Sequence, residues 1–312
     1  MIEIVKYNST MQAQWDETVK ASRNGTFMHH RAFMDYHSDR FADYSLMAMD
    51  KGRVVAVLPA NRRDDTVYSH QGLTYGSWLV TPKCDAVMMM HIMDATVAFL
   101  KEDGVAELVY KPVPHIYHSY PGEDDLYALF RHGATLNECS LSATIDLDAP
   151  IRFDRGNRSA VNRALRAGVT VGESDDYEGY WQVLQEVLAS RHDASPVHTV
   201  NEMRLLQSRF PGNIKLYTAT LGGDVVAGVV MFYAGPVAHS QYIASSPTGR
   251  DNGALALLFD MLIRQSADEG FRYFDFGISC EDHGRYLNEG LVTQKNRLGG
   301  RGITYNVYKL KL

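Results

Sequence analysis

The sequence has few cysteines, no long apolar run and no excess of basic residues, and each absence excludes a class of protein. Cys84, Cys139 and Cys280 are an odd, scattered set without metal-ligand spacing, so they suit a reducing cytoplasm better than a disulfide framework. No apolar stretch approaches the roughly 20 residues that span a bilayer. The first residues lack the apolar core of a signal peptide. We therefore expect a cytoplasmic protein without a membrane span.

The charge balance argues against a nucleic-acid partner. The chain has 31 Lys and Arg against 37 Asp and Glu, a formal net charge of −6, whereas surfaces that bind nucleic acid usually carry a basic excess. Its 312 residues, 45% of them hydrophobic and 22% charged, are sufficient for two globular domains of ordinary size. His29 and His30 have no acidic partner at metal-like spacing, so we predict no metal site.

The main positive feature is an order of predicted elements that occurs twice. Each copy has a strand, a glycine turn, a returning strand, a polar strand, a helix that a glycine ends, and a short last strand. In the first copy the elements are residues 44–50, 53–58, 68–70, 86–101 and 107–110, and in the second they are residues 214–220, 225–233, 239–243, 254–268 and 273–276. Because a duplicated unit forms a cleft between its copies, we expect a ligand to bind there.

The segment Asp148-Ala-Pro150 marks the predicted boundary between the copies. We predict an N-terminal domain at residues 1–150 and a C-terminal domain at residues 151–312 that carries the donor site. Three helices are expected early in the second copy, at residues 159–167, 176–191 and 199–210. The alternating residues 304–312 read as a last strand, which we expect to complete the second sheet.

Three segments of the second copy carry a resemblance to a known family. They are a basic helix with a Gly-Val step at residues 158–170, the strand Gly-Phe-Arg-Tyr-Phe-Asp-Phe-Gly at 270–277, and Lys-Asn-Arg-Leu-Gly-Gly at 295–300. Together with the repeated order of elements they resemble GNAT-superfamily acyltransferases of the tandem-domain, FemAB-like type. The resemblance covers most of the chain. It implies an α/β (α+β) fold of two tandem GNAT-like units, each a mixed, mostly antiparallel sheet flanked by helices.

The resemblance also implies a donor site. In GNAT enzymes a Gln/Arg-x-x-Gly-x-Gly/Ala turn precedes the core helix, and its backbone N–H groups hold the pyrophosphate of acyl-CoA. By this resemblance Arg250, Asn252, Gly253 and Ala254 would bind acetyl-CoA or another acyl-CoA. Leu255 stands where the motif has its last small residue. The alternative is an ordinary loop that starts a helix.

The polar segment His239-Ser-Gln-Tyr242 is unusual for a central strand, which normally runs apolar. In the GNAT fold this strand separates from its neighbour and pairs with the acyl donor. We assign Tyr242 to the donor and His239 and Gln241 to the substrate. The alternative is a strand with one face in solvent. In the related region of the first copy, the candidates for substrate contact are His70, Gln71 and Tyr75.

The candidate catalytic residues follow the strand at 273–276. Glu281 or His283 can accept the proton that an attacking amine loses, Asp275 is a further candidate base, and Tyr286 can protonate a leaving thiolate. A nucleophilic Cys280–His283 pair is an open alternative, as is a buried Cys280 thiol.

Other polar residues of the second copy can be interpreted either as functional or as structural. By the resemblance, Lys295 lies at the substrate cleft, although a solvated lysine would fit the sequence as well. His192 and His198 can contact substrate or serve a structural role. The arginines Arg158, Arg163 and Arg166 can meet an anionic substrate or face water.

Three functions compete. The first, which we predict, is an N-acyltransferase that moves an acyl group, by direct attack, to an amine of a small molecule, amino sugar or cell-envelope precursor. The second is a FemAB-type peptidyltransferase of peptidoglycan synthesis that uses aminoacyl-tRNA. The acidic balance and the lack of room for a long charged helical hairpin between residues 167 and 214 count against it. The third is a non-catalytic binding protein with a degenerate GNAT fold. The sequence does not indicate an oligomeric state.

Overall fold

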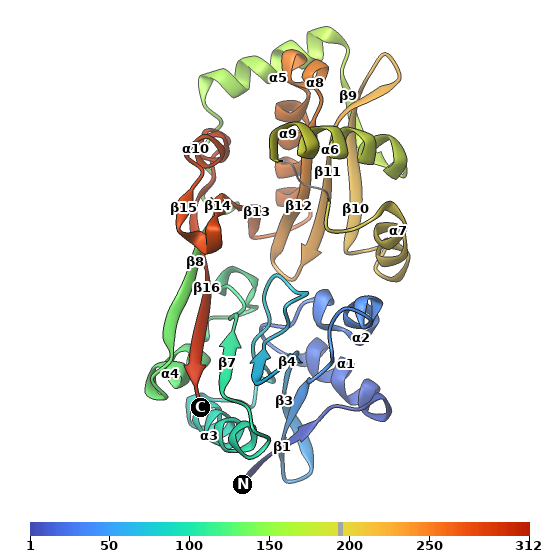
Figure 1. Ribbon diagram of the computed structural model, residues 1–312. Coiled ribbons are helices and arrows are strands. Elements are labelled where there is room, and N and C mark those ends of the chain that lie inside the picture. Colours follow the sequence, from blue (N-terminus) through green and yellow to red (C-terminus); the bar gives the residue numbers. More distant parts are fainter. Residues whose placement is uncertain (193–195) are drawn as a thin grey trace. The chain divides into compact units, whose positions relative to one another are not determined.

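The computed structural model describes residues 1–192 and 196–312, which form two compact units. The first unit comprises residues 1–140, 280–286 and 304–312, and the second comprises residues 141–279 and 287–303 (Figure 1). Each unit thus takes segments from distant parts of the chain. The predicted boundary of the sequence repeat near Pro150 stays a prediction.

The strands of the first unit form two groups. The first group has the order β1-β2-β3-β6 with antiparallel neighbours. The second group has the order β4-β5-β7-β16. The strands are β1 (Ile2–Lys6), β2 (Leu46–Asp50), β3 (Arg53–Leu58), β4 (Asn61–Arg63), β5 (Thr66–Tyr68), β6 (Leu79–Val80), β7 (Glu107–Tyr110) and β16 (Arg301–Lys311).

The helices of the first unit are α1 (Gln12–Ala21), α2 (Arg31–Met34), α3 (Ala86–Glu102) and α4 (Asp124–Arg131). Of these, α1 and α3 pack directly on the strands. In α3, Met89, Ile92, Met93 and Leu100 recur at helical spacing and are buried, as an amphipathic helix against a core requires. The carboxylate of Asp85 caps the helix by accepting the Met88 N–H at 2.8 Å. Short 3₁₀ turns are η1 (Ser9–Met11), η2 (Phe27–His29), η3 (Asp35–His37), η4 (His115–Tyr117) and η5 (Asp282–Gly284).

The second unit is built on a mixed sheet in the order β8-β13-β12-β11-β10-β9. Its neighbours pair antiparallel except β12 and β13, which are parallel. The strands are β8 (Thr135–Asp146), β9 (Thr170–Ser174), β10 (Ile214–Leu221), β11 (Asp224–Ala234), β12 (Val237–Ser245) and β13 (Tyr273–Ile278). Two short strands, β14 (Cys280–Glu281) and β15 (Tyr286–Leu287), pair with each other.

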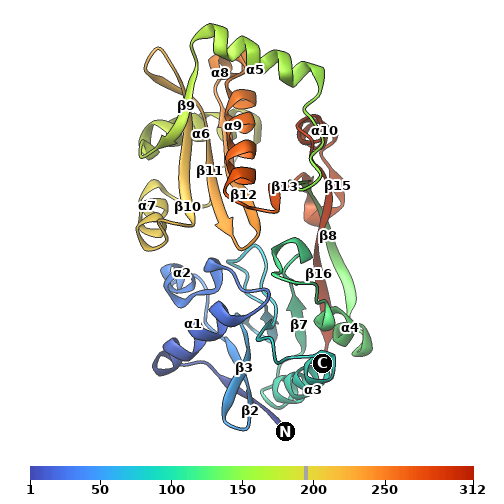
Figure 2. The same cartoon turned by 180° about the vertical axis from the view of Figure 1, so that it is seen from behind.

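Helices cover both faces of this sheet. Figures 1 and 2 show α6 (Tyr177–His192) on one face and α9 (Ala254–Asp268) on the other. The remaining helices are α5 (Arg155–Ala167), α7 (Val200–Arg209), α8 (Pro247–Asn252) and α10 (Glu289–Arg297). A Cβ at Gly228 of β11 would lie 2.3 Å from the Tyr180 ring, so glycine there allows α6 to pack directly on the sheet. The predicted fold class is confirmed.

The same strand pairing occurs in both units. In the first unit β5 and β7 pair in parallel over three positions, from Thr66↔Glu107 to Tyr68↔Val109. In the second unit β12 and β13 pair in parallel over three positions, from Val237↔Tyr273 to His239↔Asp275. Helix α3 joins the first pair and α9 joins the second. This shared arrangement is the structural counterpart of the repeat in the sequence.

The prediction for the last strand was wrong. The segment 304–312, expected to complete the second sheet, belongs to the first unit, where Tyr308 and Leu310 of β16 pair with Tyr110 and Leu108 of β7. Leu310 is buried in the apolar core of that unit. An alternating pattern indicates that one side of a strand is buried, but it does not indicate against which sheet.

No helix in the described part of the chain is long and apolar enough to cross a membrane. The same residues contain no group of three or more His, Cys, Asp and Glu side chains that could hold a metal ion.

Candidate functional site in the second unit

The candidate site lies where β12 and β13 separate. Their parallel pairing ends at His239↔Asp275, while β12 continues along β11 to Ser245. A β-bulge follows at once, because Val230 pairs with Tyr242 and Met231 with Ser240. Gln241 therefore has no partner in the β11 ladder. Beyond His239, β12 has no pairing with β13 among the described residues, and a strand edge without a strand partner can pair with an extended ligand.

A hydrogen-bonded pair of His239 and Asp275 marks the point of separation. His239 Nδ1 lies 2.7 Å from Asp275 Oδ2, and the Asp275 side chain is fully buried. Two hydroxyl groups of β8 donate to Asp275 Oδ1, from Ser142 at 2.6 Å and from Thr144 at 2.7 Å. The carboxylate is thus held by groups from two neighbouring strands.

Strand alternation explains why this carboxylate avoids the apolar core. Phe274 and Phe276 pack edge-on against Phe259 of α9, with ring centroids 6.1 and 5.1 Å away. Asp275 lies between them in sequence, so its side chain points to the opposite face of the sheet. The aromatic residues anchor β13 and thereby fix the position of Asp275.

The electrostatics of the pair determine its proton positions. Burial by itself would raise the pKa of Asp275, but the hydrogen bond and charge of His239 and the two hydroxyl donors hold that pKa below its usual range. An ionised carboxylate only accepts hydrogen bonds, so Nδ1 of His239 carries a proton. In the neutral imidazole Nε2 is then unprotonated and able to accept a proton. The ring lies beside Gly277, where a Cβ would come within 3.5 Å of His239 Cε1.

Lys295 ties α10 to the end of β13. Its side chain is buried, and Nζ donates to the carbonyl oxygens of Gly277 at 2.8 Å and Ile278 at 2.7 Å. These bonds hold β13 just past the separation point. They give Lys295 a structural role, and its contact with substrate stays a prediction.

Tyr242 lies on the α6 side of β12. Its hydroxyl is 2.6 Å from Nδ1 of His198, and its ring meets Trp181 of α6 edge-on at 5.4 Å. The sequence-predicted residues His198, His239, Gln241 and Tyr242 are thus all placed within this unit. The side chain of His192 lies outside the described residues.

The predicted phosphate turn is engaged in contacts with the protein itself. The N–H groups of Gly249, Arg250 and Gly253 already have acceptors within the turn. The Arg250 side chain donates to the Ser245 carbonyl, and that of Asn252 donates to Thr248.

Helix α5 also packs on this turn. Gly253 has a φ of +75°, and a Cβ there would lie 2.4 Å from the Ala160 carbonyl oxygen of α5. Ala254 is fully buried. Helix packing therefore explains the glycine, and pyrophosphate binding at this turn stays a prediction.

The predicted catalytic residues fall in different units. Asp275 is in the second unit, whereas Glu281, His283 and Tyr286 are in the first. His283 Nδ1 lies 3.2 Å from Glu138 Oε1, and Glu281, His283 and Tyr286 are exposed. Among the predicted catalytic and substrate residues, the second unit brings together Asp275 and His239.

The first unit holds its three predicted substrate residues in a loop after β5. His70, at a φ of +63°, stacks on His37 with ring centroids 5.2 Å apart, and burial lowers its pKa to about 3. Gln71 exchanges hydrogen bonds with the Asn61 side chain. Tyr75 is buried, with its ring 4.7 Å from that of Tyr117.

Sequence reasoning missed three residues that shape these sites. Ser142 and Thr144 alternate with apolar residues along β8, and this polar alternation was their signal. The third is Lys111, which follows β7 and donates through Nζ to the Leu73 carbonyl. Burial lowers the pKa of Lys111 to about 8. Lysine at the end of a short strand gave no signal of such a contact.

Comparisons with known proteins agree with this geometry. Residues 153–285 match the acetyltransferase (GNAT) domain family. No curated protein sequence matches the chain.

Several solved structures share the fold. FemX superimposes with a TM-score of 0.70 at 15% identity, covering 99% of this chain and 97% of its own. The C-terminal domain of a putative lysylphosphatidylglycerol synthetase from Agrobacterium fabrum gives 0.65 at 12% identity, covering 98% and 93%. A tandem GNAT protein of the clavulanic acid biosynthesis pathway gives 0.51 at 15% identity, covering 100% and 98%. At these identities the likeness shows the fold alone, which is the predicted fold of two tandem GNAT-like units.

Proposed function

We propose that this protein, with its tandem GNAT fold of the FemAB-like type, is an N-acyltransferase that transfers an acyl group from acyl-CoA to an amine. The acceptor class is a small molecule, an amino sugar or a cell-envelope precursor. One observation carries the proposal: the His239–Asp275 pair stands where β12 and β13 stop pairing.

The open side of β12 suits an acyl donor with amide groups. Such a donor can add to β12 as an extra strand and bring its acyl carbon to His239. Backbone groups fixed in a strand need no reorganisation to stabilise charge that develops on the acyl oxygen.

The reaction we propose is direct attack without a covalent enzyme intermediate. The neutral amine attacks the thioester carbon, a C–N bond forms, and the C–S bond breaks. The amine proton passes to Nε2 of His239, and the imidazolium that forms gives this proton to the departing thiolate. Asp275 keeps His239 in the tautomer that accepts this proton and stabilises the imidazolium that results.

A second donor, aminoacyl-tRNA, is favoured by one observation. The turn expected to hold the CoA pyrophosphate is packed against α5 at Gly253. Against this donor, the described residues between α5 and β10 hold only β9 and the ordinary helices α6 and α7, not a long charged hairpin. The formal net charge of −6 also disfavours tRNA.

The first experiment is thermal unfolding with a panel of acyl-CoAs. A donor at about 100 times its dissociation constant adds roughly 2.7 kcal/mol of stability, which gives a visible shift in Tm. The H239Q variant should keep this shift and lose acyl transfer to amines. If no acyl-CoA shifts Tm but charged tRNA supports transfer, the second donor replaces the first. If no acyl-CoA shifts Tm and charged tRNA does not support transfer, the proposal fails.

A further inference from the structure

A pocket of about 530 Å³ lies in the second unit, and none of the residues that line it belongs to β12 or β13. Its walls come from β8, the segment before α5, α5 itself and the second half of α9. Ligand pockets typically span about 300–1,000 Å³. Most lining side chains are apolar, among them Ile145, Leu147, Ile151, Phe153, Ile263 and Leu298.

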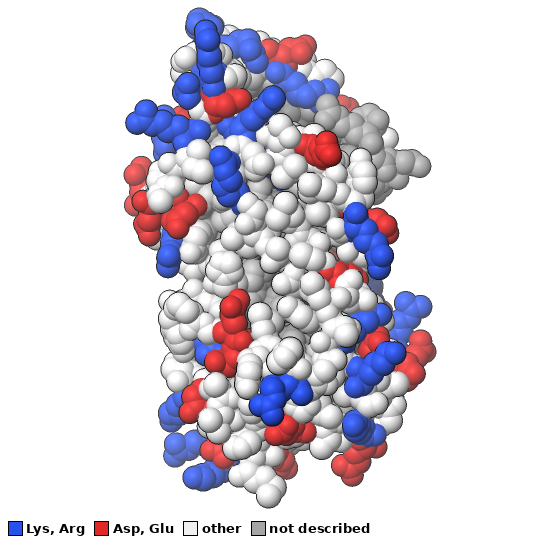
Figure 3. All heavy atoms as spheres, turned by 90° about the vertical axis from the view of Figure 1, so that its left-hand side faces the viewer, with Lys and Arg blue, Asp and Glu red and all other residues white. Residues whose placement is uncertain are grey.

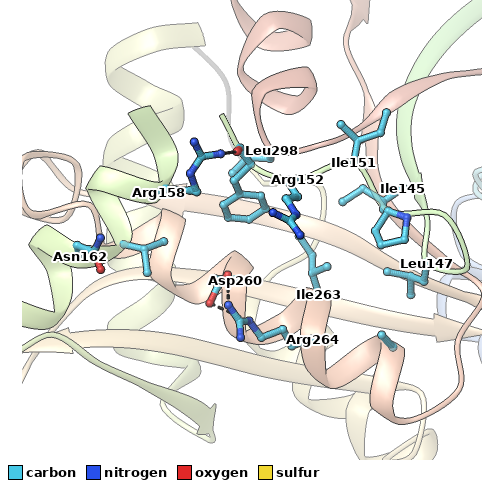
Figure 4. Close-up of a pocket in the computed structure, with 14 residues that line it drawn as sticks. Ile145, Leu147, Ile151, Arg152, Arg158, Asn162, Asp260, Ile263, Arg264 and Leu298 are labelled. Atoms are coloured by element: carbon cyan, nitrogen blue, oxygen red, sulfur yellow. Dashed lines mark hydrogen bonds and ion pairs between the residues drawn. The ribbon is translucent and has the colours of Figure 1, made fainter. Parts of the chain in front are cut away.

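Three arginines stand among these apolar side chains, as Figure 4 shows: Arg152, Arg158 and Arg264. Arg264 pairs with Asp260 on its own helix at 3.1 Å. Arg158 donates to the backbone carbonyl of Phe153. In the described part of the chain neither Arg152 nor Arg158 has an acidic partner.

The basic character continues along α5. This helix also carries Arg155, Arg163 and Arg166 and has no acidic residue. In Figure 3, Lys and Arg gather at the upper end of the face, the end at which Figure 1 places α5. Such a concentration of positive charge is unexpected in a chain with a formal net charge of −6. Ile151 and Leu165 beside it are 44% and 58% exposed.

We propose that this pocket binds an amphiphile in which an apolar chain carries an anionic carboxylate or phosphate head. The chain would lie along the apolar wall, and the head would meet Arg152 and Arg158. A guanidinium matches the oxygens of either head group through paired hydrogen bonds. An uncharged hydrocarbon would leave the arginines unused, and a free anion would leave the apolar wall unused. The proposal does not depend on the proposed acyltransferase function.

Calorimetric titration of the full chain with dodecyl phosphate, below its micelle concentration, tests the site. Dodecanol and inorganic phosphate separate the contributions of chain and head. We expect dodecyl phosphate to bind at least tenfold more tightly than either. Equal affinity for dodecanol, or no binding of dodecyl phosphate, overturns the proposal.

Matched variants locate the binding. R152Q should weaken dodecyl phosphate binding about tenfold, because it removes a charge-assisted contact. R163Q removes the same charge from α5 outside the pocket and should leave the affinity within twofold. A267F fills the pocket without changing charge and should abolish binding while circular dichroism and Tm show a folded protein. Equal effects of R152Q and R163Q would mean non-specific attraction and overturn the site.

Co-sedimentation with vesicles distinguishes the source of the amphiphile. Retention on phosphatidylglycerol vesicles but not phosphatidylcholine vesicles, lost in R152Q and A267F, identifies a membrane lipid. Binding of monomeric dodecyl phosphate without retention on vesicles identifies a soluble amphiphile. Failure in both assays overturns the proposal.

Discussion

Replacing Asp275 by Asn tests the proton arrangement at the separation of β12 and β13. The change keeps the shape of the side chain and removes its charge. An amide oxygen can still accept from Ser142 and Thr144, as the carboxylate does at 2.6 and 2.7 Å. The amide nitrogen, however, is a donor, so Nδ1 of His239 must become the acceptor and the proton must move to Nε2.

The D275N change should lower both the stability of the fold and the catalytic rate. A hydrogen bond to a charged group contributes about 1.5–3 kcal/mol, so D275N should lower the free energy of unfolding at pH 7 by about that amount. General base catalysis contributes about 10²–10⁴-fold in rate, so kcat should fall by a factor in that range once Nε2 is protonated.

The pH dependence has a definite sign. The folded-state pKa of Asp275 is lowered, so its stabilisation is present above the unfolded pKa of about 3.9 and is lost as pH falls through the folded pKa. The stability gap between wild type and D275N should therefore shrink as pH falls below about 4.

Two measurements check this. Urea unfolding between pH 3 and 7 gives the gap, and nitrogen-15 NMR of the His239 ring gives the tautomer. The reasoning is refuted if wild-type His239 carries its neutral-form proton on Nε2, or if D275N leaves the tautomer unchanged.

Three further predictions concern stability. Ala at Gly253 combines a φ of +75° with a clash against α5, whereas Ala at Gly270 (φ +85°) meets nothing within 4 Å. Urea unfolding should therefore show a loss of about 1–3 kcal/mol from backbone strain in G270A and a larger loss in G253A. Equal losses in the two variants would contradict the packing role of Gly253. K295M leaves two carbonyl groups without their buried donor and should cost about 1–3 kcal/mol. K309M removes a surface ion pair with Glu107, in which the Lys309 side chain is 39% exposed, and should cost less than about 1 kcal/mol. Similar Tm losses in the two variants would refute this. Burial, and to a smaller extent neighbouring positive charges, lowers the pKa of His70 to about 3, so His70 lowers the stability of the fold as pH falls from about 6.5 towards 3. H70Q should therefore reduce the slope of the unfolding free energy against pH between pH 6.5 and 4.5. An unchanged slope would argue against a buried neutral His70.

Much of the second unit could be predicted because its signals are local. The glycine turn at Gly222-Gly223, the alternation in 225–233 and the apolar stripe of 254–268 each depend on residues close together in the chain. The structure gives strands at Ile214–Leu221 and Asp224–Ala234 and a helix at Ala254–Asp268, as expected. The polar segment His239-Ser-Gln-Tyr242 lies on β12, as a strand was expected there, and its role in ligand binding stays a prediction.

The candidate site could be predicted only in part, because its contacts join distant residues. Asp275 and His239 were both selected, but for separate roles, and 36 residues separate them in the chain. Ser142 lies 133 residues from Asp275, and no local pattern could assign it to that carboxylate. The turn at Gly253 has a phosphate-like sequence, yet a glycine that admits a phosphate and one that admits a helix look the same in sequence.

The sequence by itself determined the tandem order of elements, the class of fold and the strand on which the candidate site is built, because turn residues and apolar periodicity act over a few residues. Only the tertiary structure decided that β16 joins the first unit, that α5 covers the Gly253 turn, and that His239 and Asp275 form one pair. These outcomes depend on which surfaces bury each other, and burial is a property of residues far apart in the chain.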